Sequence, residues 1–522
     1  MTTTAATTAG AFPLIWDDPK DAELTWFFDI EHTPDVMTPL GFDLYFGPFI
    51  NGFRWLRACL QNYYVYNWWP AGTGENAARN TTLEQLKEAS RHFWDKIVPE
   101  VEGYTQRFLR TNFDAFSDAD LAAEIEKLPA LRTRMGNLHT LALFPYSDGM
   151  RHLIATYQEI TGGDDLAAVR LVQGHGNKSV EAGRALWQLS QLTASIPAVR
   201  ERVSRVDHTS AGECMGALQR EAAAQPFLDA FASFLDAYGW RTDLFEFAMP
   251  TWAEDPTIPL CQLRTYLGMP DYNPDAEQQR QVTERDEAIA ETMSRLAPEA
   301  STKLRNAIEG ARHVVSLQED HNFYIDQRCA FSPRRLVLAA ARRLVSNGVL
   351  AESNDVFYLR GTELLSALSG GLRDAQSISD RTKAEMTRWS DVEPPQIIGA
   401  APAEEPPPSA FGDHGSQQLK GNGASSGVAR GPARVLMTLA EADRLRPGDV
   451  LIARTTMPAW TPLFAAACAV VTETGGVLSH AAVVAREYGI PAVLNVASAT
   501  RLIRDGQLVE VDGSQGIVRI IS

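Results

Sequence analysis

The sequence lacks paired cysteines. Its cysteines form no CxxC pair and lie far apart, at Cys59, Cys214, Cys261, Cys329 and Cys468. An odd and scattered set of this kind excludes a disulfide framework and a cysteine-based metal cluster. We therefore expect free thiols and a cytoplasmic location.

The sequence also lacks an excess of positive charge and any long apolar run. Its formal net charge of −17 argues against nucleic acid and anionic lipid as partners, because both require a basic surface. No window approaches the roughly 18 consecutive apolar residues of a membrane span. The first residues, MTTTAATTAGAF, contain no basic segment followed by an apolar one, so we expect no signal peptide.

What is present is a composition typical of a globular protein, with 45% apolar residues in a chain of 522, enough for two or three domains. Residues 1–390 are rich in segments whose apolar side chains recur every three or four positions, such as TLEQLKEASRHFWDKIVPEVEGYTQRFL. This spacing is that of amphipathic helices. It predicts a mainly α-helical domain over residues 1–390.

The pattern changes twice after residue 390. Residues 391–418 are dominated by proline, alanine and acidic side chains, which is typical of a semi-rigid linker. Residues 419–522 contain short β-type runs such as GDVLIA, CAVVTE and LVEVDG, with few helical segments, of which SHAAVVAREYG, MPAWTPLFAAA and TLAEADRL are the candidates. We therefore predict a multidomain protein with a C-terminal α/β module.

One stretch of this module, TETGGVLSHAAVVAREYG, places a histidine where a helix begins. The strand CAVVTE is followed by a glycine turn, and Ser479 can cap a helix that starts at His480. The positive helix terminus disfavours imidazolium, so we expect a neutral, nucleophilic imidazole. The same terminus would stabilise a phosphoryl group on this ring, and Gly475 and Gly476 would let the backbone approach it.

The longer stretch TETGGVLSHAAVVAREYGIPAVLNV resembles the phosphohistidine swivelling domain of the phosphoenolpyruvate-utilising enzymes. The matching positions are Gly475, Gly476, Ser479, His480, Ala485, Arg486, Glu487, Gly489, Ile490 and Pro491. The resemblance implies that His480 carries a phosphoryl group, supported by Gly475, Gly476, Ser479 and Arg486. The alternative is a capped surface histidine without a role.

The resemblance also implies a separate loading site. Relatives load the histidine from ATP in an ATP-grasp domain or from phosphoenolpyruvate in a C-terminal barrel. Residues 1–390 contain no glycine-rich phosphate loop, and only about 40 residues follow His480. We therefore expect a separate ATP-grasp kinase subunit that binds most of the ATP and Mg²⁺, and no dedicated metal site in this chain.

The helical domain more loosely resembles the acceptor-binding domain of rifampin phosphotransferase and of phenylphosphate synthase. The segments that carry this resemblance are EHTPDVMTPL, QGHGNKSVEAGRALWQL, FLDAYGWRTDLFEFAMPTWAEDP and SLQEDHNFYIDQ. Phosphoryl transfer to a hydroxyl requires a proton acceptor and cations for the phosphoryl oxygens. The candidate catalytic residues are Glu319 and His321, and the candidate binding residues are Glu31, Trp240, Arg241, Arg312, Gln318, Asn322 and Arg328.

The phosphoryl-binding cation is the uncertain part of this site. Relatives often have Arg-Glu where this chain has Gln318-Glu319, so Arg241 and Arg312 are the substitutes. At α-helical spacing Gln318, Asn322 and Ile325 share one face, while Glu319 and Phe323 share the neighbouring one.

Structural roles are the alternatives for these residues. Arg312 could pair with Glu319 at the surface, and His321 could be a core residue. Arg241 could form a buried ion pair with Glu246 or Asp243.

The acceptor itself is suggested by an aromatic cluster between Trp26 and Trp69. Most of these rings are expected to build the core, but their density near EHTPDVMTPL favours an apolar pocket with few polar groups. We expect a small aromatic hydroxyl compound, phenol or 4-cresol, as the acceptor. The alternatives are another acceptor, such as an antibiotic hydroxyl or a carboxylate, and a non-catalytic phosphohistidine protein that regulates a partner.

Overall fold

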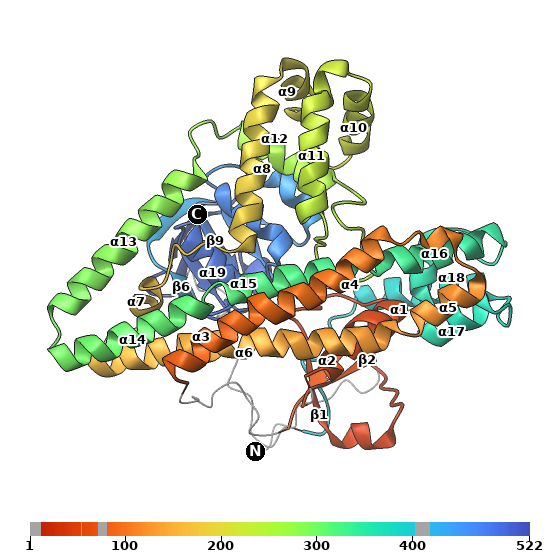
Figure 1. Ribbon diagram of the computed structural model, residues 1–522, viewed down its shortest axis with the longest axis horizontal. Coiled ribbons are helices and arrows are strands. Elements are labelled where there is room, and N and C mark those ends of the chain that lie inside the picture. The colour runs from red at the N-terminus through yellow and green to blue at the C-terminus, as the bar shows by residue number, and fades with distance from the viewer. Residues whose placement is uncertain (1–11, 54, 71–80, 402–417, 522) are drawn as a thin grey trace.

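The computed structural model describes residues 12–53, 55–70, 81–401 and 418–521. Long helices form an elongated layer that runs horizontally in Figure 1. The first of them begins as the sequence predicts, because Thr82 and Gln85 form a reciprocal capping box at its N-terminus. The layer consists of α3 (Leu83–His92), η3 (Phe93–Ile97), α4 (Val98–Arg110), α5 (Asp118–Ile125), α6 (Leu128–Thr161), α13 (Pro274–Ser294), α14 (Pro298–Val314), α15 (Leu317–His321), η6 (Asn322–Cys329) and α16 (Arg334–Ser346).

Shorter helices complete one end of the layer and its connections. They are α1 (Pro39–Gly41), η2 (Phe42–Phe46), α2 (Gly47–Asn51), α7 (Asp165–Arg170), α17 (Gly361–Leu368) and α18 (Ala375–Ser390). Isolated 3-10 turns lie at η1 (Pro19–Glu23), η4 (Phe113–Ala115), η5 (Ala222–Ala224) and η7 (Ser353–Tyr358).

A small antiparallel sheet lies under the helical layer (Figure 1). Its strand order is β2 (Arg57–Gln61), β3 (Tyr64–Trp68), β1 (Thr25–Phe28) and β4 (Ile397–Gly399). The last strand lies within residues 391–418, where the sequence predicts a linker, so packed structure extends into that range. Backbone pairing with β1 explains this, since Trp26 lies opposite Ile398 and both are buried. Residues 402–417 of the predicted linker lie outside the described residues.

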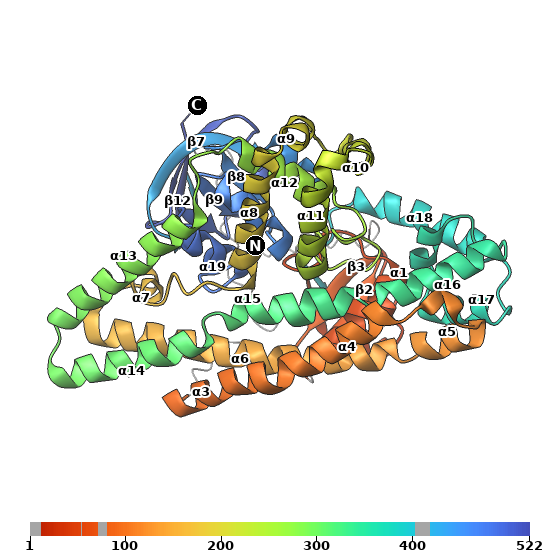
Figure 2. The same ribbon diagram turned by 45° about the horizontal axis from the view of Figure 1, so that its top comes forward.

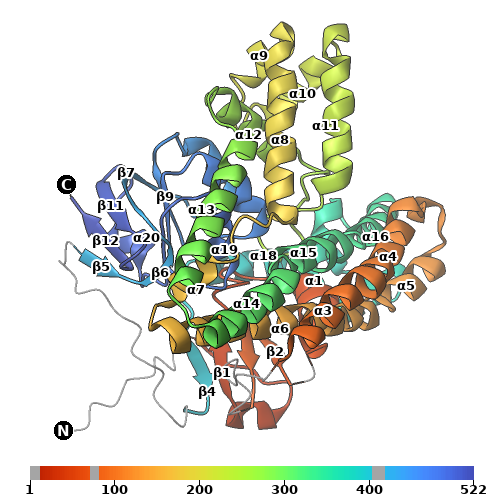
Figure 3. The ribbon, with the colours of Figure 1, turned by 60° about the vertical axis from the view of Figure 1, so that its left-hand side comes forward.

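The C-terminal module is built on one eight-stranded sheet, seen from the side in Figure 3. Strands β7, β8, β9 and β10 pair in parallel with their neighbours, and the edge strand β6 pairs antiparallel with β10. The strand order is β5 (Gln418–Lys420), β12 (Ile517–Ile520), β11 (Leu508–Asp512), β7 (Val428–Val435), β8 (Val450–Ala453), β9 (Ala469–Thr472), β10 (Ala492–Leu494) and β6 (Asn422–Ser425). Strands β8, β9 and β10 are buried throughout, as expected of parallel strands covered on both faces.

The helical segments of this module are short. They are η8 (Leu439–Arg444), η9 (Pro458–Ala465), α19 (His480–Glu487) and α20 (Ala499–Leu502). Two of the three predicted helices are 3-10 helices, and Pro458 and Pro462 inside η9 explain one of them, because proline cannot donate the hydrogen bonds of an α-helix. The mainly helical N-terminal part and the C-terminal α/β module together confirm the predicted fold class. No helix among the described residues is both long and apolar enough to cross a bilayer.

A group of upright helices packs directly on the C-terminal module (Figure 2). They are α8 (Lys178–Ser195), α9 (Pro197–Val203), α10 (Ala211–Gln219), α11 (Gln225–Tyr238) and α12 (Thr257–Leu267). One continuous hydrophobic core contains Phe231 and Trp252 from the helical part and Trp460 and Phe464 from the module. The two parts therefore share a core in this arrangement.

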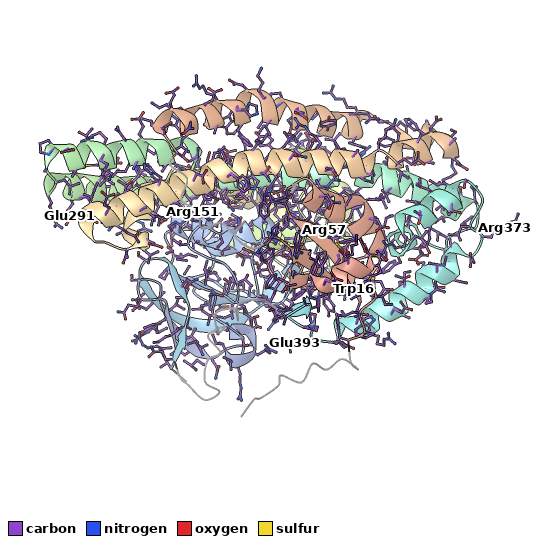
Figure 4. All side chains as sticks on the ribbon, turned by 90° about the horizontal axis from the view of Figure 1, so that it is seen from below. Trp16, Arg57, Arg151, Glu291, Arg373 and Glu393 are labelled. Atoms are coloured by element: carbon purple, nitrogen blue, oxygen red, sulfur yellow. The ribbon has the colours of Figure 1, made fainter. Side chains whose placement is uncertain are left out.

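Polar contacts reinforce that junction. Asp243 accepts hydrogen bonds from the Trp460 indole N–H and the Leu439 backbone N–H, both at 2.8 Å. On the underside, Glu393 pairs with Arg501 at 3.1 Å, and Figure 4 labels Glu393 at the edge of the module. These contacts fix the module so that its loop before α19 faces α6 and α15.

A pair of glycines tests the packing beneath this loop. A Cβ at Gly136 of α6 would lie 2.0 Å from the backbone oxygen of Phe49, whereas a Cβ at Gly103 of α4 would meet no atom within 4 Å. We expect Gly136→Ala to lower the free energy of unfolding by about 1–3 kcal/mol or more. Gly103→Ala should raise it by about 0.5–1 kcal/mol, because alanine is the better helix former. Urea denaturation measures both, and an equal effect of the two changes would contradict the close α2–α6 packing.

Candidate active site

His480 is the first residue of α19, directly after the loop that follows β9. Ser479 occupies the predicted N-cap position with extended backbone angles, but its side chain makes no capping hydrogen bond. Its hydroxyl oxygen is buried and has no partner among the described residues. Gly475 has a φ of +104°, and a Cβ there would lie 2.9 Å from that hydroxyl, so glycine is required at this turn.

The glycine loop is held from both sides. The Tyr146 hydroxyl of α6 donates to the backbone oxygen of Leu478 at 3.1 Å. Arg486 of α19 donates to the backbone oxygens of Val477 at 2.8 Å and Ala424 at 2.9 Å, and burial lowers the pKa of its guanidinium. Arg486 therefore supports the loop from within the module and does not line the cavity described below.

The imidazole of His480 contacts a buried carboxylate of the helical part. Its Nδ1 lies 2.7 Å from Oε2 of Glu319 in α15, and the Ser179 hydroxyl donates to the same oxygen at 2.6 Å. Burial alone would raise the pKa of Glu319, but His480 and these hydrogen bonds outweigh it and hold the pKa below its usual value. Nε2 of His480 has no hydrogen-bond partner among the described residues, so this nitrogen is the one left for chemistry.

A second acidic residue fastens α19 to the helical part. The carboxylate of Glu487 accepts hydrogen bonds from the backbone N–H groups of Gly174 at 2.9 Å and Gly176 at 3.2 Å. Both glycines have positive φ angles, +72° and +69°, which explains the QGHGNKS sequence before α8. Ser179 follows this loop and binds the Glu319 carboxylate that contacts His480, so the segment contacts the C-terminal end of α19 directly and its N-terminal end through Glu319.

His480, Ser479 and the glycine pair line one wall of a cavity of about 1190 Å³ between the module, α6 and the small sheet. Part of the predicted aromatic cluster lines the opposite side, namely Phe27, Phe28, Tyr45, Phe46, Phe49, Phe53, Trp55 and Trp69. Other members, such as Trp26 and Tyr66, are fully buried core residues. The cluster therefore serves both as core and as cavity wall.

The helix that carries Glu319 changes its winding at the cavity. Gln318, His321 and Asn322 line the cavity, but Ile325 is buried in the core and Asp326 takes the position on the cavity wall. The reason is that η6 is a π-helix, whose wider turn brings residues five apart onto one face. The α-helical spacing used for the sequence prediction is therefore wrong at Ile325.

His321 and Asp326 meet on this face. His321 Nδ1 is in hydrogen-bond contact with the Leu317 backbone oxygen, which leaves its Nε2 3.5 Å from Oδ2 of Asp326. Burial, with a smaller effect of His139, lowers the pKa of His321 to about 4. The imidazole of His321 is therefore neutral at pH 7.

Several predicted binding residues lie elsewhere. Arg312 is exposed on α14 and does not line the cavity, because its helical face points to solvent. Arg328 pairs with Glu102 at 3.4 Å on a different surface, and Trp240 donates to the Asp236 backbone oxygen, also outside the cavity. Glu31 is exposed at the cavity rim.

Arg241 lies behind the site instead of inside the cavity. It is 1% exposed and donates to the Gln327 side chain at 3.1 Å, with its guanidinium over the rings of Tyr238, Trp252 and Phe323. It forms neither of the ion pairs considered as alternatives, since Glu246 binds Thr38 and Asp243 binds the module. Burial lowers the pKa of Arg241 to about 10.

Other residues of the site gave no sequence signal. Arg132, His139, Tyr146 and Arg151 lie on α6, Ser179 on α8 and Asp326 on η6, and only packing brings these three helices together. The capping sequence NKS before α8 could have suggested Ser179 only as a helix start. Their roles depend on tertiary packing.

The contact between His480 and Glu319 can be tested by a double-mutant cycle with Glu319→Gln and His480→Gln. We expect a coupling of about 1.5–3 kcal/mol, because the hydrogen bond involves a charged group and is buried. If the losses of unfolding free energy in the two single variants add up, within about 0.5 kcal/mol, to the loss in the double variant, the result would contradict the contact.

The same variants predict a pH dependence. Because the pKa of Glu319 is lowered in the folded state, the carboxylate contributes fully to the free energy of unfolding above pH 4.5, its usual pKa. This contribution is lost as the pH falls through the pKa of the folded state. Glu319→Gln should therefore lose less stability in acid than the wild type. Glu299→Gln, which changes an exposed carboxylate, is the control.

Two family models match the chain. Residues 141–319 match the fourth domain of rifampicin phosphotransferase, and residues 445–516 match the mobile domain of the PEP-utilising enzymes. The first match ends at Glu319 and the second contains His480.

The chain is similar in sequence to three curated proteins. The chain is 31% identical to the chondramide synthase cmdD of Chondromyces crocatus, over 98% of this chain and 14% of that protein. It is 30% identical to the uncharacterized phosphotransferase YvkC of Bacillus subtilis (strain 168), over 80% and 51% of the two chains. It is also 30% identical to the rifampicin phosphotransferase of Streptomyces sviceus, over 70% and 42%.

The chain thus spans between 14 and 51% of the length of these relatives. The two family models include Glu319 and His480, the two sides of the contact described above. Residues 445–516 thus match the mobile domain of the PEP-utilising enzymes, and the chain is similar to the rifampicin phosphotransferases.

Proposed function

We propose that this chain is part of an ATP-dependent phosphotransferase in which His480 carries the phosphoryl group to a hydroxyl acceptor bound in the cavity. The observation that carries the proposal is the orientation of His480. Its Nδ1 contacts Glu319, its Nε2 is buried and has no partner among the described residues, and the residue itself lines the cavity. A phosphoryl group on Nε2 would stand beside the N-terminus of α19, which favours negative charge.

Glu319 then has a defined role in the transfer. By accepting a hydrogen bond from Nδ1–H, its carboxylate stabilises the protonated phosphoimidazole, from which a neutral imidazole can leave. The P–Nε2 bond breaks as the bond from phosphorus to the acceptor oxygen forms, and the electron pair returns to Nε2. The hydroxyl proton passes to a base, for which the neutral His321 and the unpartnered Oε1 of Glu319 are the available groups.

The lining of the cavity supports an apolar, aromatic hydroxyl compound as the acceptor. Aromatic rings face the cavity from the small sheet and from η2 and α2, and polar side chains from these and other elements provide hydrogen-bonding groups around them. Phenol and 4-cresol are the smallest members of this class. The volume of 1190 Å³ favours a second candidate, a larger hydroxyl compound, because pockets for drug-sized ligands measure roughly 300–1,000 Å³.

Loading from ATP is assigned, as part of the same proposal, to an ATP-grasp unit on another chain in the cytoplasm. ATP and Mg²⁺ would bind mainly there, where the ion would neutralise the phosphates. The support is that the two matched regions are the fourth domain of rifampicin phosphotransferase and the mobile domain of the PEP-utilising enzymes, neither of which is described as an ATP-binding domain. Labelling of His480 when the purified chain alone is given ATP would contradict this part.

Chemical loading tests the transfer without the partner. We would phosphorylate the chain with phosphoramidate, add 4-cresol, phenol or rifampicin, and follow phosphohistidine and product by ³¹P NMR and mass spectrometry. The wild type should convert at least one of these acceptors to a phosphate ester, and His480→Gln should convert none. Glu319→Gln should keep its label but transfer it roughly 10²–10⁴-fold more slowly, the usual effect of losing an acid–base group.

His208→Gln is the matched control for His480→Gln. Like His480, this exposed histidine contacts a carboxylate, that of Asp443 at 3.3 Å, but it lies outside the cavity. It should transfer at the wild-type rate. Label lost only to water, at one rate with and without every acceptor, would reject the proposed enzyme in favour of a non-catalytic phosphohistidine protein. Conversion of rifampicin alone would select the larger acceptor class.

A further inference from the structure

Three side chains with metal-binding atoms converge on the cavity wall beside the proposed reaction site. His139 of α6, His321 of α15 and Asp326 of η6 each offer one ligand atom, and these atoms lie within 4.8 Å of one another. Among the described residues this is the one such group of histidine, cysteine and acidic side chains. We propose that these three residues bind a single divalent transition-metal ion, with Zn²⁺ as the type ion.

The spacing of the atoms fits such an ion. His139 Nδ1 lies 3.0 Å from Oδ2 of Asp326, and His321 Nε2 lies 3.5 Å from the same oxygen. Bonds of about 2.0–2.1 Å to a tetrahedral Zn²⁺ hold neighbouring ligand atoms about 3.3 Å apart. The two observed separations lie on either side of this value, so small side-chain rotations suffice to admit the ion.

The residues are also oriented as ligands are. The contact of His321 Nδ1 with the Leu317 backbone oxygen places its proton on Nδ1 and leaves the Nε2 lone pair toward Asp326. The Tyr45 hydroxyl donates to the Asp326 backbone oxygen at 3.3 Å and fixes that turn. Outer contacts of this kind orient metal ligands and set their affinity.

The wall contains further unpaired acceptors. The side-chain oxygens of Gln318 and Asn322 are buried and have no partner among the described residues, and both residues line the cavity on the same helical segment. Buried oxygens without a partner are rare in proteins and are satisfied by a cation or by a donor of a ligand. Both would suit an open coordination position that faces the cavity.

Charge around the site acts in both directions. Asp326 is the anionic ligand: burial would raise the pKa of its carboxyl, but His139 and, more weakly, His321 and Arg132 hold that pKa low. Arg132 is buried, with its guanidinium over the rings of Tyr45 and Phe49, and its positive charge weakens the attraction for the ion. Together, ion and arginine would make this wall cationic, which supplies the phosphoryl-binding charge that Gln318 does not.

This inference goes beyond the proposed function and does not depend on it. Metal binding requires neither an acceptor nor a phosphorylated His480. It also replaces the expectation from the sequence that the chain has no dedicated metal site. The sequence contains no indication of one, because the ligands stand at positions 139, 321 and 326, and this spacing resembles no metal-binding motif. With the ion bound, His321 is a ligand and is no longer the base for the acceptor hydroxyl.

The test is direct binding to the purified full-length chain after treatment with a chelator. Isothermal titration with ZnCl₂ should show one strong site, and His139→Gln should weaken it at least tenfold, the lower end of the effect seen when even an outer contact of a metal ligand is lost. Asp326→Asn should do the same. Excess Zn²⁺ should raise the melting temperature of the wild type but not of these variants, because the ion binds only the folded site.

His480→Gln and His208→Gln are the controls, and both should bind Zn²⁺ as tightly as the wild type. Because Asp326 is buried, X-ray absorption of the Zn²⁺-loaded wild type provides a second measurement that needs no variant to fold, with two imidazoles in the ligand set as the expected result. Binding lost in His480→Gln but kept in His139→Gln would overturn the proposal. So would the absence of a strong site in the wild type.

Discussion

The site is organised around the contact between His480 and Glu319, which joins two modules that are far apart in the sequence. A carboxylate that is fully buried needs a partner, and here the partners are an imidazole from the C-terminal module and the hydroxyl of Ser179. The contact uses Nδ1 of the ring and leaves Nε2 without a partner among the described residues. Position, tautomer and reactivity of the histidine therefore all follow from one hydrogen bond.

The surrounding fold makes this contact possible and also limits it. Tyr146 and Glu487 hold the glycine loop and α19 against the helical part, Arg486 supports the loop within the module, and the two parts share a hydrophobic core. A histidine loaded at a distant ATP site would have to leave this position and return to it. In the proposed cycle the docked arrangement is the delivery state, and leaving it would expose the shared hydrophobic core around Trp460 and Phe464.

The sequence predicts the local parts of this site well and the tertiary parts poorly. The loop around His480 is readable because strand, glycine turn and helix start are adjacent in the chain. Ser179 and His139 are not readable, since only packing brings their helices to Glu319 and Asp326. The π-helical turn is the instructive case, because it exchanges Ile325 for Asp326 on the cavity wall. Four of the predicted binding residues also lie outside the cavity, namely Trp240, Arg241, Arg312 and Arg328.

The most direct measurement of the central claim is the position of the phosphoryl group on the ring of His480. After loading of the full-length chain, two-dimensional NMR of the ¹⁵N-labelled histidine distinguishes the two nitrogens. The Glu319 contact at Nδ1 predicts that phosphorus is attached to Nε2. Attachment to Nδ1 would contradict the claim, because the phosphoryl group would then occupy the position of the Glu319 carboxylate and could not face the acceptor cavity.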